Sequence, residues 1–416
     1  MRIAIIGAGI RGLATAGALC RAGFDTQVFE GAASVRAGGS GITLFANALT
    51  ALDSLGYGEP IRALQARQPS VLGGQRTHTG RLLAKLPADL ASQSLAVSRQ
   101  ELHRILLGGI PEPRVHTGHR LTSASTTGEL EFSTGASDEP VHKRFDVVIG
   151  ADGIRSTVRA AIGLDPGTRF AGYSAWRGIA PSPVDLAGMA GESWGVRTRF
   201  GYAPLADGGT YWFAVRSTEA SDENPGQSAR TVEADPHPAL EALFGDWHEP
   251  IPQLIAATLT NSIGYLPITE LADDLSVFYR GHCVLIGDAA HAMTPNMGQG
   301  AAQGLEDAAT LVALLRREFD RRDNQRTDTG DTAIARVTNA NAPAAPALPR
   351  VFAEYDALRR PRSQQIALQS RRIGQASHAT GRITSPIRDA MMRLVPDSLI
   401  AHTVRELAAW QPPHNE

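Results

Sequence analysis

The sequence has few cysteines, no excess of charge and no long apolar run. Its 416 residues include only two cysteines, Cys20 and Cys283, which are too few for a disulfide framework and lack the spacing of metal ligands. Lys and Arg total 40 and Asp and Glu total 42, so net charge indicates neither nucleic acid nor an anionic membrane as partner. No uninterrupted apolar run reaches the roughly 18 residues of a spanning helix. The opening MRIAIIGAG leaves no room for a signal peptide. We therefore expect a cytoplasmic protein with no membrane span.

The first 30 residues have the pattern of a dinucleotide-binding unit. A β-branched run over residues 2–6 leads into Gly7-Ala8-Gly9-Ile10-Arg11-Gly12, a helical pattern and a second strand that ends on Glu30. Gly7 permits the tight turn, Gly9 lets the backbone approach a pyrophosphate, and Gly12 lets helix and strand pack closely. Glu30 lies where a carboxylate binds a ribose diol. Such a glycine pattern also arises by chance, but here strand, turn, helix, strand and acid fall in order. The motif itself leaves open NAD or FAD, while Glu30 disfavours NADP.

Two further glycine turns follow predicted strands. Residues 145–149 precede GADGIRS at 150–156, and residues 281–286 precede GDAAHAMTPNMGQG at 287–300, which leads into a helical pattern over 301–315. Taken alone, an Asp between two glycines is most often a plain turn. In the later loop Pro295 fixes the backbone, and Gly298 and Gly300 allow a flat ring to lie against main-chain atoms. The helix terminus can stabilise an anion or an electron-rich carbonyl.

The motifs in this order resemble those of FAD-dependent aromatic hydroxylases of the p-hydroxybenzoate hydroxylase type, in particular the salicylate and urate hydroxylase-like branch. These class A flavoprotein monooxygenases share the three turns. The resemblance spans nearly the whole chain, because it also includes RAGGSGITLFAN at 36–47, SRQELHRIL at 98–106, GLEDA at 304–308 and YDALRRPR at 355–362. It implies an α/β fold: a Rossmann-like FAD-binding domain with an inserted, mainly β substrate domain and C-terminal helices.

The resemblance also implies a role for each matching residue. Gly7, Gly9, Gly12 and Glu30 would hold the ADP half of FAD, and Arg36 and Arg99 would contact its phosphate or ribityl region. Asp152 would contact the pyrophosphate or NAD(P)H, and Asp288 would bond the ribityl chain. The isoalloxazine ring would lie against the loop of Pro295, Gly298, Gln299 and Gly300. Arg11 stands where a small residue is more usual, which puts the close packing of the first turn in question.

The chain carries one dinucleotide unit, not two. We find no second complete strand, G-x-G-x-x-G and helix unit, of the kind that disulfide reductases and Baeyer–Villiger oxygenases normally carry. A single unit suits enzymes in which NAD(P)H binds transiently. The W-x-W-x-I-P motif of tryptophan halogenases is absent, and so is a Ser-His-Asp cluster with convincing spacing. No cluster of residues has convincing metal-ligand spacing either, so we expect no bound metal.

The expected domains are discontinuous. Residues 1–66, 97–172 and 279–320 would form the FAD-binding domain, and residues 67–96 and 173–278 the substrate domain. Residues 321–350 are polar, then rich in Ala, Pro and Asn, and would bury too little apolar surface to offset ordering, which predicts a flexible insertion. Helical periodicity returns over residues 351–416.

Two residues of the predicted substrate sheet are candidates for catalysis. In the urate-hydroxylating relatives, an Arg five residues before a Pro and a Tyr seven after it face the substrate, and Arg199, Pro204 and Tyr211 have that spacing. The alternative is that Tyr211 is only one of the alternating core and edge residues of a strand. Histidine as a residue type can act as a catalytic base, but the place of His291 in the cofactor motif favours structural hydrogen bonding over that role.

The resemblance predicts a single-component FAD monooxygenase that uses NAD(P)H and O₂. A flavin C4a-hydroperoxide would hydroxylate a small aromatic or heteroaromatic substrate. An epoxidase or reductase of the same fold, or a non-catalytic FAD-binding protein, stays open as an alternative. The sequence leaves open the substrate, the choice of NADH or NADPH, the catalytic base, and whether the protein is a monomer or a homodimer.

Overall fold

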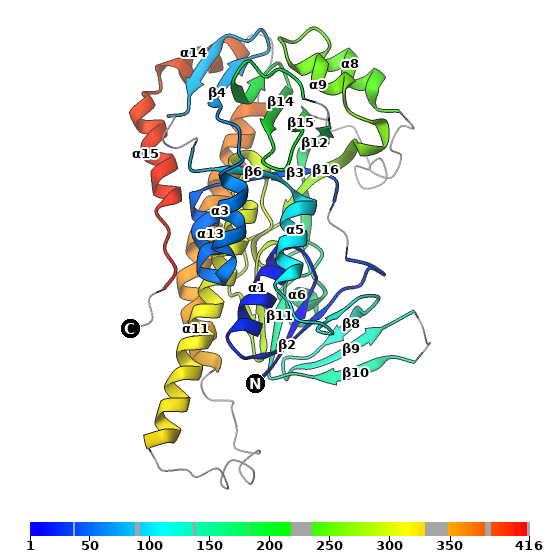
Figure 1. The fold of residues 1–416 in the computed structure, drawn as a ribbon, viewed down its shortest axis with the longest axis vertical. Helices are drawn as coiled ribbons and strands as arrows, with labels where there is room; N and C mark the ends of the chain where they lie inside the picture. The colour runs from blue at the N-terminus through cyan, green and yellow to red at the C-terminus, as the bar shows by residue number, and fades with distance from the viewer. Residues whose placement is uncertain are drawn as a thin grey trace.

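The structure is a computed structural model that describes residues 1–35, 38–87, 92–135, 139–181, 183–217, 235–328, 348–378 and 384–413. Figure 1 shows a lower part that holds both the N-terminal strand and the middle strands of the chain, and an upper part built around a second sheet. Two long helices, α11 (Gly300–Asp328) and α13 (Leu348–His378), pack against each other along one side.

The lower sheet has the order expected of a dinucleotide-binding fold. Its strands are buried apolar runs, as parallel strands covered on both faces must be. All of its strand pairs are parallel except β17 with β18. The order is β17 (Tyr279–Arg280), β18 (Cys283–Leu285), β11 (Val147–Gly150), β1 (Arg2–Ile6), β2 (Asp25–Phe29) and β7 (Val115–His116). Helices α1 (Ile10–Arg21) and α5 (Arg99–Gly108) pack together beside it, and α1 also contacts α11.

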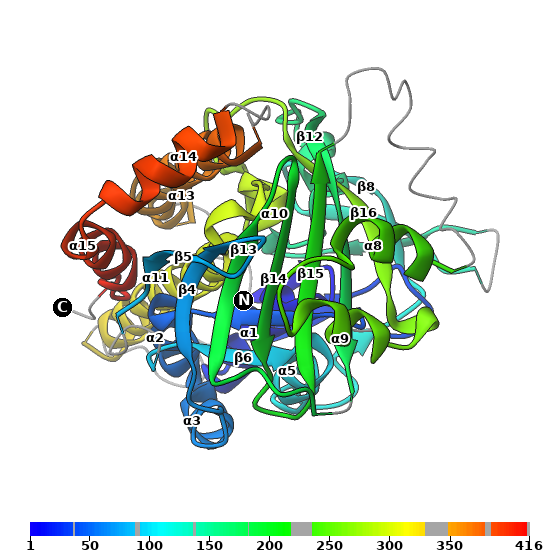
Figure 2. The ribbon, with the colours of Figure 1, turned by 90° about the horizontal axis from the view of Figure 1, so that it is seen from above.

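The upper sheet is mainly antiparallel. Its order is β16 (Gly264–Leu271), β12 (Thr168–Ala180), β15 (Thr210–Ser217), β14 (Thr198–Pro204), β13 (Met189–Trp194), β4 (Leu72–Thr77) and β5 (Leu82–Lys85). Helices α8 (His237–Phe244) and α9 (Ile251–Ala256) cover one face through a cluster that includes Phe200, Trp212 and Phe244. Seen from above, the sheet lies across the dinucleotide-binding part (Figure 2). Its other face is therefore turned toward that part.

Smaller elements join the two parts. The two-stranded sheet of β3 (Gly41–Leu44) and β6 (Leu95–Ser98) lies where the chain passes between them, and β3 also contacts β15. The remaining elements are α2 (Ala46–Leu52), η1 (Asp53–Tyr57), α3 (Gly58–Gln65), β8 (Arg120–Ala124), β9 (Glu129–Ser133), β10 (Val141–Arg144), α6 (Thr157–Ala161), η2 (Thr260–Ser262), α10 (Asp288–His291), η3 (Pro295–Met297), α14 (Thr384–Leu394) and α15 (Asp397–Ala408).

The structure differs from the expected boundaries in two places. Strand β12 begins at Thr168, so the upper sheet starts a few residues before the expected change at 172, because Thr168 already pairs with Leu271. Helix α11 continues to Asp328, past the expected start of a flexible insertion at 321, and α13 begins at Leu348. The rest of that expected insertion, residues 329–347, lies outside the described residues.

Candidate flavin site and the sheet that faces it

The three glycine turns meet at one edge of the lower sheet. Strands β1, β11 and β18 are parallel neighbours, with Ile6 beside Gly150 and Gly150 beside Leu285. Each strand is followed directly by its turn, so the turns come together at the carboxyl ends of the strands. This edge is where open α/β sheets bind their ligands.

The first turn is shaped by steric contacts with the second. Gly7 has φ +105°, and a Cβ there would lie 2.6 Å from the carbonyl oxygen of Ala151. A Cβ on Gly12 would lie 2.0 Å from the Gly7 oxygen, so only glycine allows α1 to approach the strand this closely. Gly9 is exposed and would meet nothing within 4 Å, which leaves room for a ligand against its backbone. The Glu30 carboxylate accepts hydrogen bonds from the backbone N–H groups of Ala8 and Ala32, each at 2.9 Å.

In the second turn, Asp152 is tied to its own loop and helix. Its carboxylate accepts hydrogen bonds from the Ser156 hydroxyl at 2.5 Å and from the Thr157 N–H at 2.7 Å. Burial raises the pKa of Asp152, and these hydrogen bonds oppose the increase. Arg159 follows on α6 and donates from Nη1 to the carbonyl oxygen of Ala289, 3.0 Å away. This buried arginine joins the second motif to the third, a role that the sequence did not indicate.

The third motif presents its backbone to open space. Pro295 begins the short helix η3, and Gly298 ends it with φ +64°. Pro295 and Gly298 are exposed, and a Cβ on Gly300 would approach no atom closer than 4.0 Å. Gly300 is the first residue of α11. In contrast, the side chain of Gln299 is buried and accepts a hydrogen bond from Asn47 Nδ2 at 2.9 Å. The Gln299 side chain is therefore turned away from the open side of the loop and bonded to α2.

Several arginines surround Asp288 at this edge. Arg11 Nη1 forms an ion pair with Asp288 Oδ2 at 2.8 Å. Burial lowers the pKa of Arg99, and the positive charges of Arg11 and Arg177 lower it further. Partial desolvation would raise the pKa of Asp288, whose side chain is 38% exposed, but Arg11, His291 and Arg99 together hold the pKa below its usual value. One carboxylate thus faces more than one guanidinium group, so the site favours an added anion. Arg36, which was expected to contribute, lies outside the described residues.

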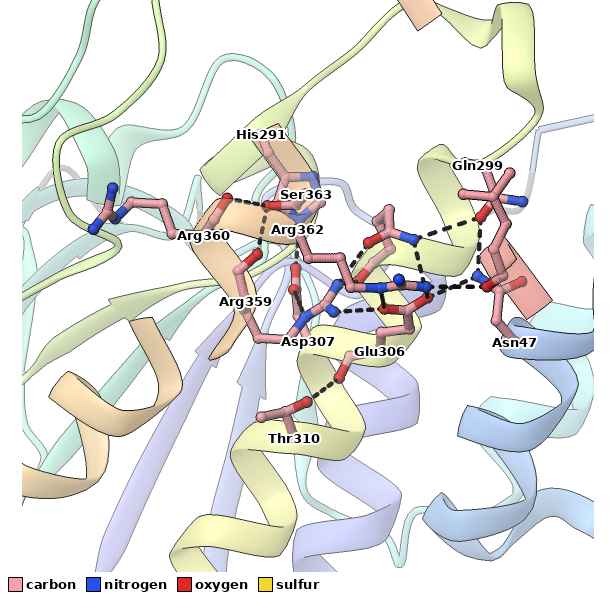
Figure 3. A network of polar contacts seen from close by, with 12 residues as sticks. Asn47, His291, Gln299, Glu306, Asp307, Thr310, Arg359, Arg360, Arg362 and Ser363 are labelled. Carbon is pink, nitrogen blue, oxygen red and sulfur yellow. Dashed lines mark hydrogen bonds and ion pairs between the residues drawn. The ribbon is translucent and has the colours of Figure 1, made fainter. Parts of the chain in front are cut away.

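A buried polar network supports the third motif from below (Figure 3). Arg359 is fully buried and donates from Nε to Asp307 Oδ1 at 2.8 Å. Arg362 Nε donates to Glu306 Oε2 at 2.8 Å, and Asn47 Nδ2 donates to Glu306 Oε1 at 2.7 Å. The two carboxylates and two guanidinium groups balance in charge. Because Asn47 also bonds Gln299, the network connects helices α2, α11 and α13 to the glycine loop.

His291 belongs to this network. Its Nε2 lies 2.6 Å from Asp307 Oδ2, and both side chains are almost fully buried. The same carboxylate oxygen accepts the Gly287 N–H at 2.8 Å. His291 therefore has the structural hydrogen-bonding environment that its place in the motif favoured. No motif indicates a role for Asp307 or Glu306, although adjacent acids within an otherwise apolar helix are a signal of buried charge.

The upper sheet carries Arg199 and Tyr211 on the face turned toward the glycine turns. Arg199 pairs with Val215, and Ala203 pairs with Tyr211. The two side chains share a face and lie four residues apart along the sheet, about 13 Å. Arg199 Nη1 donates to Asn296 Oδ1 at 3.0 Å, which connects the sheet directly to η3. Arg199 Nε also lies 2.7 Å from Glu192 Oε1.

Tyr211 lies beside β3 and the arginine cluster. A Cβ on Gly41 would lie 2.3 Å from the Tyr211 ring, so the absence of a side chain at 41 makes room for that ring. Burial raises the pKa of Tyr211, and the nearby charges of Arg177 and Arg99 only partly oppose this. The phenol therefore stays protonated near neutral pH. Phe213 lies on the same face, its ring centroid 6.2 Å from that of Tyr211.

A cleft of about 500 Å³ lies next to η3. Residues of β12, β16 and α13 line it, together with Asn296 of η3, and Tyr173 is among the β12 residues. The Tyr173 hydroxyl accepts a hydrogen bond from Asn296 Nδ2 at 3.0 Å. Arg169 and Arg371 also line the cleft, and both bond Glu270 Oε1, at 2.8 and 2.9 Å. The cleft thus borders the glycine loop with both aromatic and cationic groups.

FAD fits this site, because Gly9 and Gly300 leave backbone open to a ligand and the arginines around Asp288 can offset a pyrophosphate. The fold and site define a class A flavoprotein monooxygenase, an FAD-dependent enzyme that uses NAD(P)H to hydroxylate aromatic or heteroaromatic substrates. The family model described as FAD binding domain matches residues 1–343, and the chain belongs to that family. The predicted fold class, enzyme class and cofactors are thereby confirmed.

Known proteins are similar over much or all of the chain. Aurachin C monooxygenase/isomerase of Stigmatella aurantiaca is 32% identical over 415 residues, 98% of each chain. The 2-heptyl-3-hydroxy-4(1H)-quinolone synthase of Pseudomonas aeruginosa is 38% identical over 320 residues, 76% of this chain and 80% of the synthase. The crystal structure of Klebsiella pneumoniae HpxO with FAD and uric acid has a TM-score of 0.76 at 23% identity, over 98% of this chain and 97% of that one, and shows the same fold. Among the described residues, no helix combines the length and apolar character needed to cross a membrane.

Proposed function

We propose that the enzyme hydroxylates a 4(1H)-quinolone or a closely related nitrogen heteroaromatic ring. The observation that carries the proposal is the face of the upper sheet on which Arg199, Phe213 and Tyr211 lie opposite the glycine loop. A flat ring held between this face and the loop would have an aromatic side, a cation at one end and a neutral phenol at the other. The similarity to a 2-heptyl-3-hydroxy-4(1H)-quinolone synthase supports the choice of ring.

The chemistry of the ring matches these groups. When bound, FAD would accept reducing equivalents from NAD(P)H and deliver an electrophilic oxygen atom derived from O₂. In a 4(1H)-quinolone, loss of the ring N–H proton places electron density on C3, next to the carbonyl. Arg199, whose charge is paired with Glu192, would donate a hydrogen bond to the ring oxygen, and the Tyr211 hydroxyl would donate a second one to a ring acceptor. The overall reaction consumes one substrate, one O₂, one NAD(P)H and one proton, and yields hydroxylated product, NAD(P)⁺ and water.

The cofactor roles are part of the same proposal. Gly7, Gly9, Gly12 and Glu30 would hold the ADP half, and Arg99, with Arg36, the phosphate or ribityl region. The Asp152 turn would border the pyrophosphate, Asp288 would bond the ribityl chain, and the Pro295 to Gly300 loop would border the ring. Steric contacts at Gly7 and Gly12, and the open backbone at Gly9 and Gly300, support this arrangement.

The cleft beside Asn296 is proposed as the route by which the substrate reaches the loop, because it opens directly on η3. We also propose that the protein works in the cytoplasm as a monomer or homodimer. Light scattering of the purified protein tests the oligomeric state.

The test of the substrate is a comparison of ring classes. Purified holoenzyme should oxidise NAD(P)H faster with 2-alkyl-4(1H)-quinolones than without substrate, and ¹⁸O₂ should add one labelled oxygen to the product. The matched control is the same quinolone with a methyl group at C3, which blocks the reacting carbon. If urate or salicylate stimulates oxidation and no quinolone does, the proposed ring is wrong while the enzyme class stands.

A further inference from the structure

Arg11 occupies a position in the first glycine turn where the sequence alone suggested a packing problem. The structure shows how this side chain is accommodated. Its stem runs away from β1 toward the third motif, so Gly12 still approaches Gly7 closely. Arg11 lies on α1, near residue 7, whereas its contacts lie near residue 300.

The guanidinium group holds two separate points of the third motif. Nη1 forms the 2.8 Å ion pair with Asp288 Oδ2, and Nη2 donates to the carbonyl oxygen of Gly300 at 2.9 Å. Among the described residues, the Arg11 Nε is buried without a hydrogen-bond partner. The side chain therefore spans the distance between the turn expected to hold the adenosine end of FAD and the loop expected to hold its ring.

Two glycines make the path for this side chain. A Cβ on Gly287 would lie 2.2 Å from Arg11 Cδ, and a Cβ on Gly304 would lie 2.2 Å from both Cδ and Nε. Gly304 is an interior residue of α11, where alanine would be the better helix former. Its glycine is therefore explained by the space that Arg11 requires.

We propose that Arg11 is a positioning residue of the cofactor site, which clamps the third motif to the first and orients Asp288. By holding Oδ2, Arg11 leaves Oδ1 of the same carboxylate, for which no described residue is a hydrogen-bond partner, to bond a ligand. The clamp on the Gly300 carbonyl fixes the start of α11 at the same time. The inference rests on the proposed contact of Asp288 with the ribityl chain. It does not depend on which substrate is hydroxylated.

FAD affinity of the apoprotein tests the clamp without any turnover. Titration of apoprotein with FAD, followed by quenching of flavin fluorescence, gives Kd for the wild type and for Arg11→Ala, Arg11→Lys, Asp288→Asn and Gly304→Ala. We expect Kd to rise roughly 10- to 100-fold in Arg11→Ala, because two hydrogen bonds donated by the charged guanidinium group are lost. Arg11→Lys should be intermediate, because a single ammonium lacks the planar fork that reaches two acceptors.

The steric part of the proposal is tested by a double-mutant cycle. Gly304→Ala should displace Arg11 and weaken FAD binding, although alanine favours the helix and should not lower the melting temperature of the apoprotein. Once Arg11 is alanine, the added methyl group has no side chain to displace, so Arg11→Ala/Gly304→Ala should bind FAD no worse than Arg11→Ala. Such non-additive effects of two substitutions on FAD binding are expected when the two residues are in contact. The matched control is Arg62→Ala, which removes an exposed arginine paired with Asp53.

Three results would overturn the proposal. The first is an unchanged Kd in Arg11→Ala, even if the apoprotein melts at a lower temperature, because the role would then be structural only. The second is an unchanged Kd in Asp288→Asn together with a loss in Arg11→Ala, because Arg11 would then act on FAD without Asp288. The third is full additivity of Arg11→Ala and Gly304→Ala. A failure of every quinolone as substrate would leave all of these measurements intact.

Discussion

Asp307→Asn should destabilise the protein far more than its conservative chemistry suggests. Asp307 is fully buried and accepts three hydrogen bonds, from Arg359 Nε, His291 Nε2 and the Gly287 N–H. Asparagine has only one acceptor oxygen, so in either amide orientation its NH₂ group faces at least one of these donors. The substitution also leaves Arg359 with one fewer carboxylate in a buried site.

The expected magnitude follows from these contacts. Removing one partner of a buried ion pair costs about 3–5 kcal/mol. Unfolding entropy near 2.1 cal/mol/K per residue gives roughly 0.9 kcal/mol/K for 416 residues that unfold as one unit. The melting temperature of the apoprotein should therefore fall by about 3–6 °C. Because Gly287 precedes Asp288, the holoenzyme should also release FAD faster.

Calorimetry of apoprotein, with stopped-flow release of FAD as a second measurement, checks both effects. The matched control is Asp53→Asn, which breaks an exposed pair with Arg62 at 2.6 Å. Exposed pairs contribute about 0–1 kcal/mol, so this control should shift the melting temperature by roughly 1 °C or less. If Asp307→Asn melts no lower than Asp53→Asn, the network does not stabilise the loop as argued.

Three other predictions follow from the same geometry. Gly12→Ala should prevent isolation of yellow holoenzyme, because its Cβ would lie 2.0 Å from the Gly7 oxygen, whereas Gly9→Ala should fold normally and weaken FAD binding only. Arg199→Met should lower kcat/KM roughly 10- to 100-fold in steady-state assays with the accepted substrate, because a hydrogen bond from a charged group contributes about 1.5–3 kcal/mol. The control is Arg216→Met, since Arg216 is exposed on the same sheet. Equal losses of kcat/KM in both variants would contradict the role assigned to Arg199. The pKa of Asp307 is depressed despite its burial, because His291 and Arg359 lie against it. Its stabilisation is thus complete above the unfolded pKa near 4 and is lost as pH falls toward the lower folded pKa. The difference in melting temperature between wild type and Asp307→Asn should therefore be constant above about pH 5 and shrink below about pH 4.

The parts of the site that the sequence predicted are those that depend on backbone geometry. Gly7 and Gly12 stand where another residue would collide with main-chain atoms, and such needs are local and readable from a motif. The strands before each turn were equally readable as apolar runs. Their convergence could be expected as well, because the carboxyl ends of parallel neighbours meet at one edge of the sheet.

The parts that the sequence could not supply depend on side-chain direction over long separations. From the sequence, Arg11 puts the close packing of the first turn in question, because nothing in the motif shows that its side chain extends toward Gly304. Arg159 follows the second turn closely and Asp307 lies in GLEDA, but their partners, Ala289 and Arg359, are set by how the elements pack. The sequence can indicate that a charge is buried, but its partner follows from tertiary contacts, which no spacing rule encodes.

The upper sheet shows the same limit most clearly, because a strand alternates between two faces. From the sequence, Tyr211 is equally compatible with a substrate pocket and with an alternating core or edge position of a strand. The strand register decides between these two alternatives. Trp212 is fully buried on the face that α8 and α9 cover and donates a hydrogen bond to Thr258, while Tyr211 and Phe213 lie on the opposite face, toward the glycine turns. The same register explains Gly201, since a Cβ there would lie 2.2 Å from the Phe213 ring. Residues on one face can therefore change with the substrate while the other face keeps the sheet folded, so a family of one fold can act on many rings.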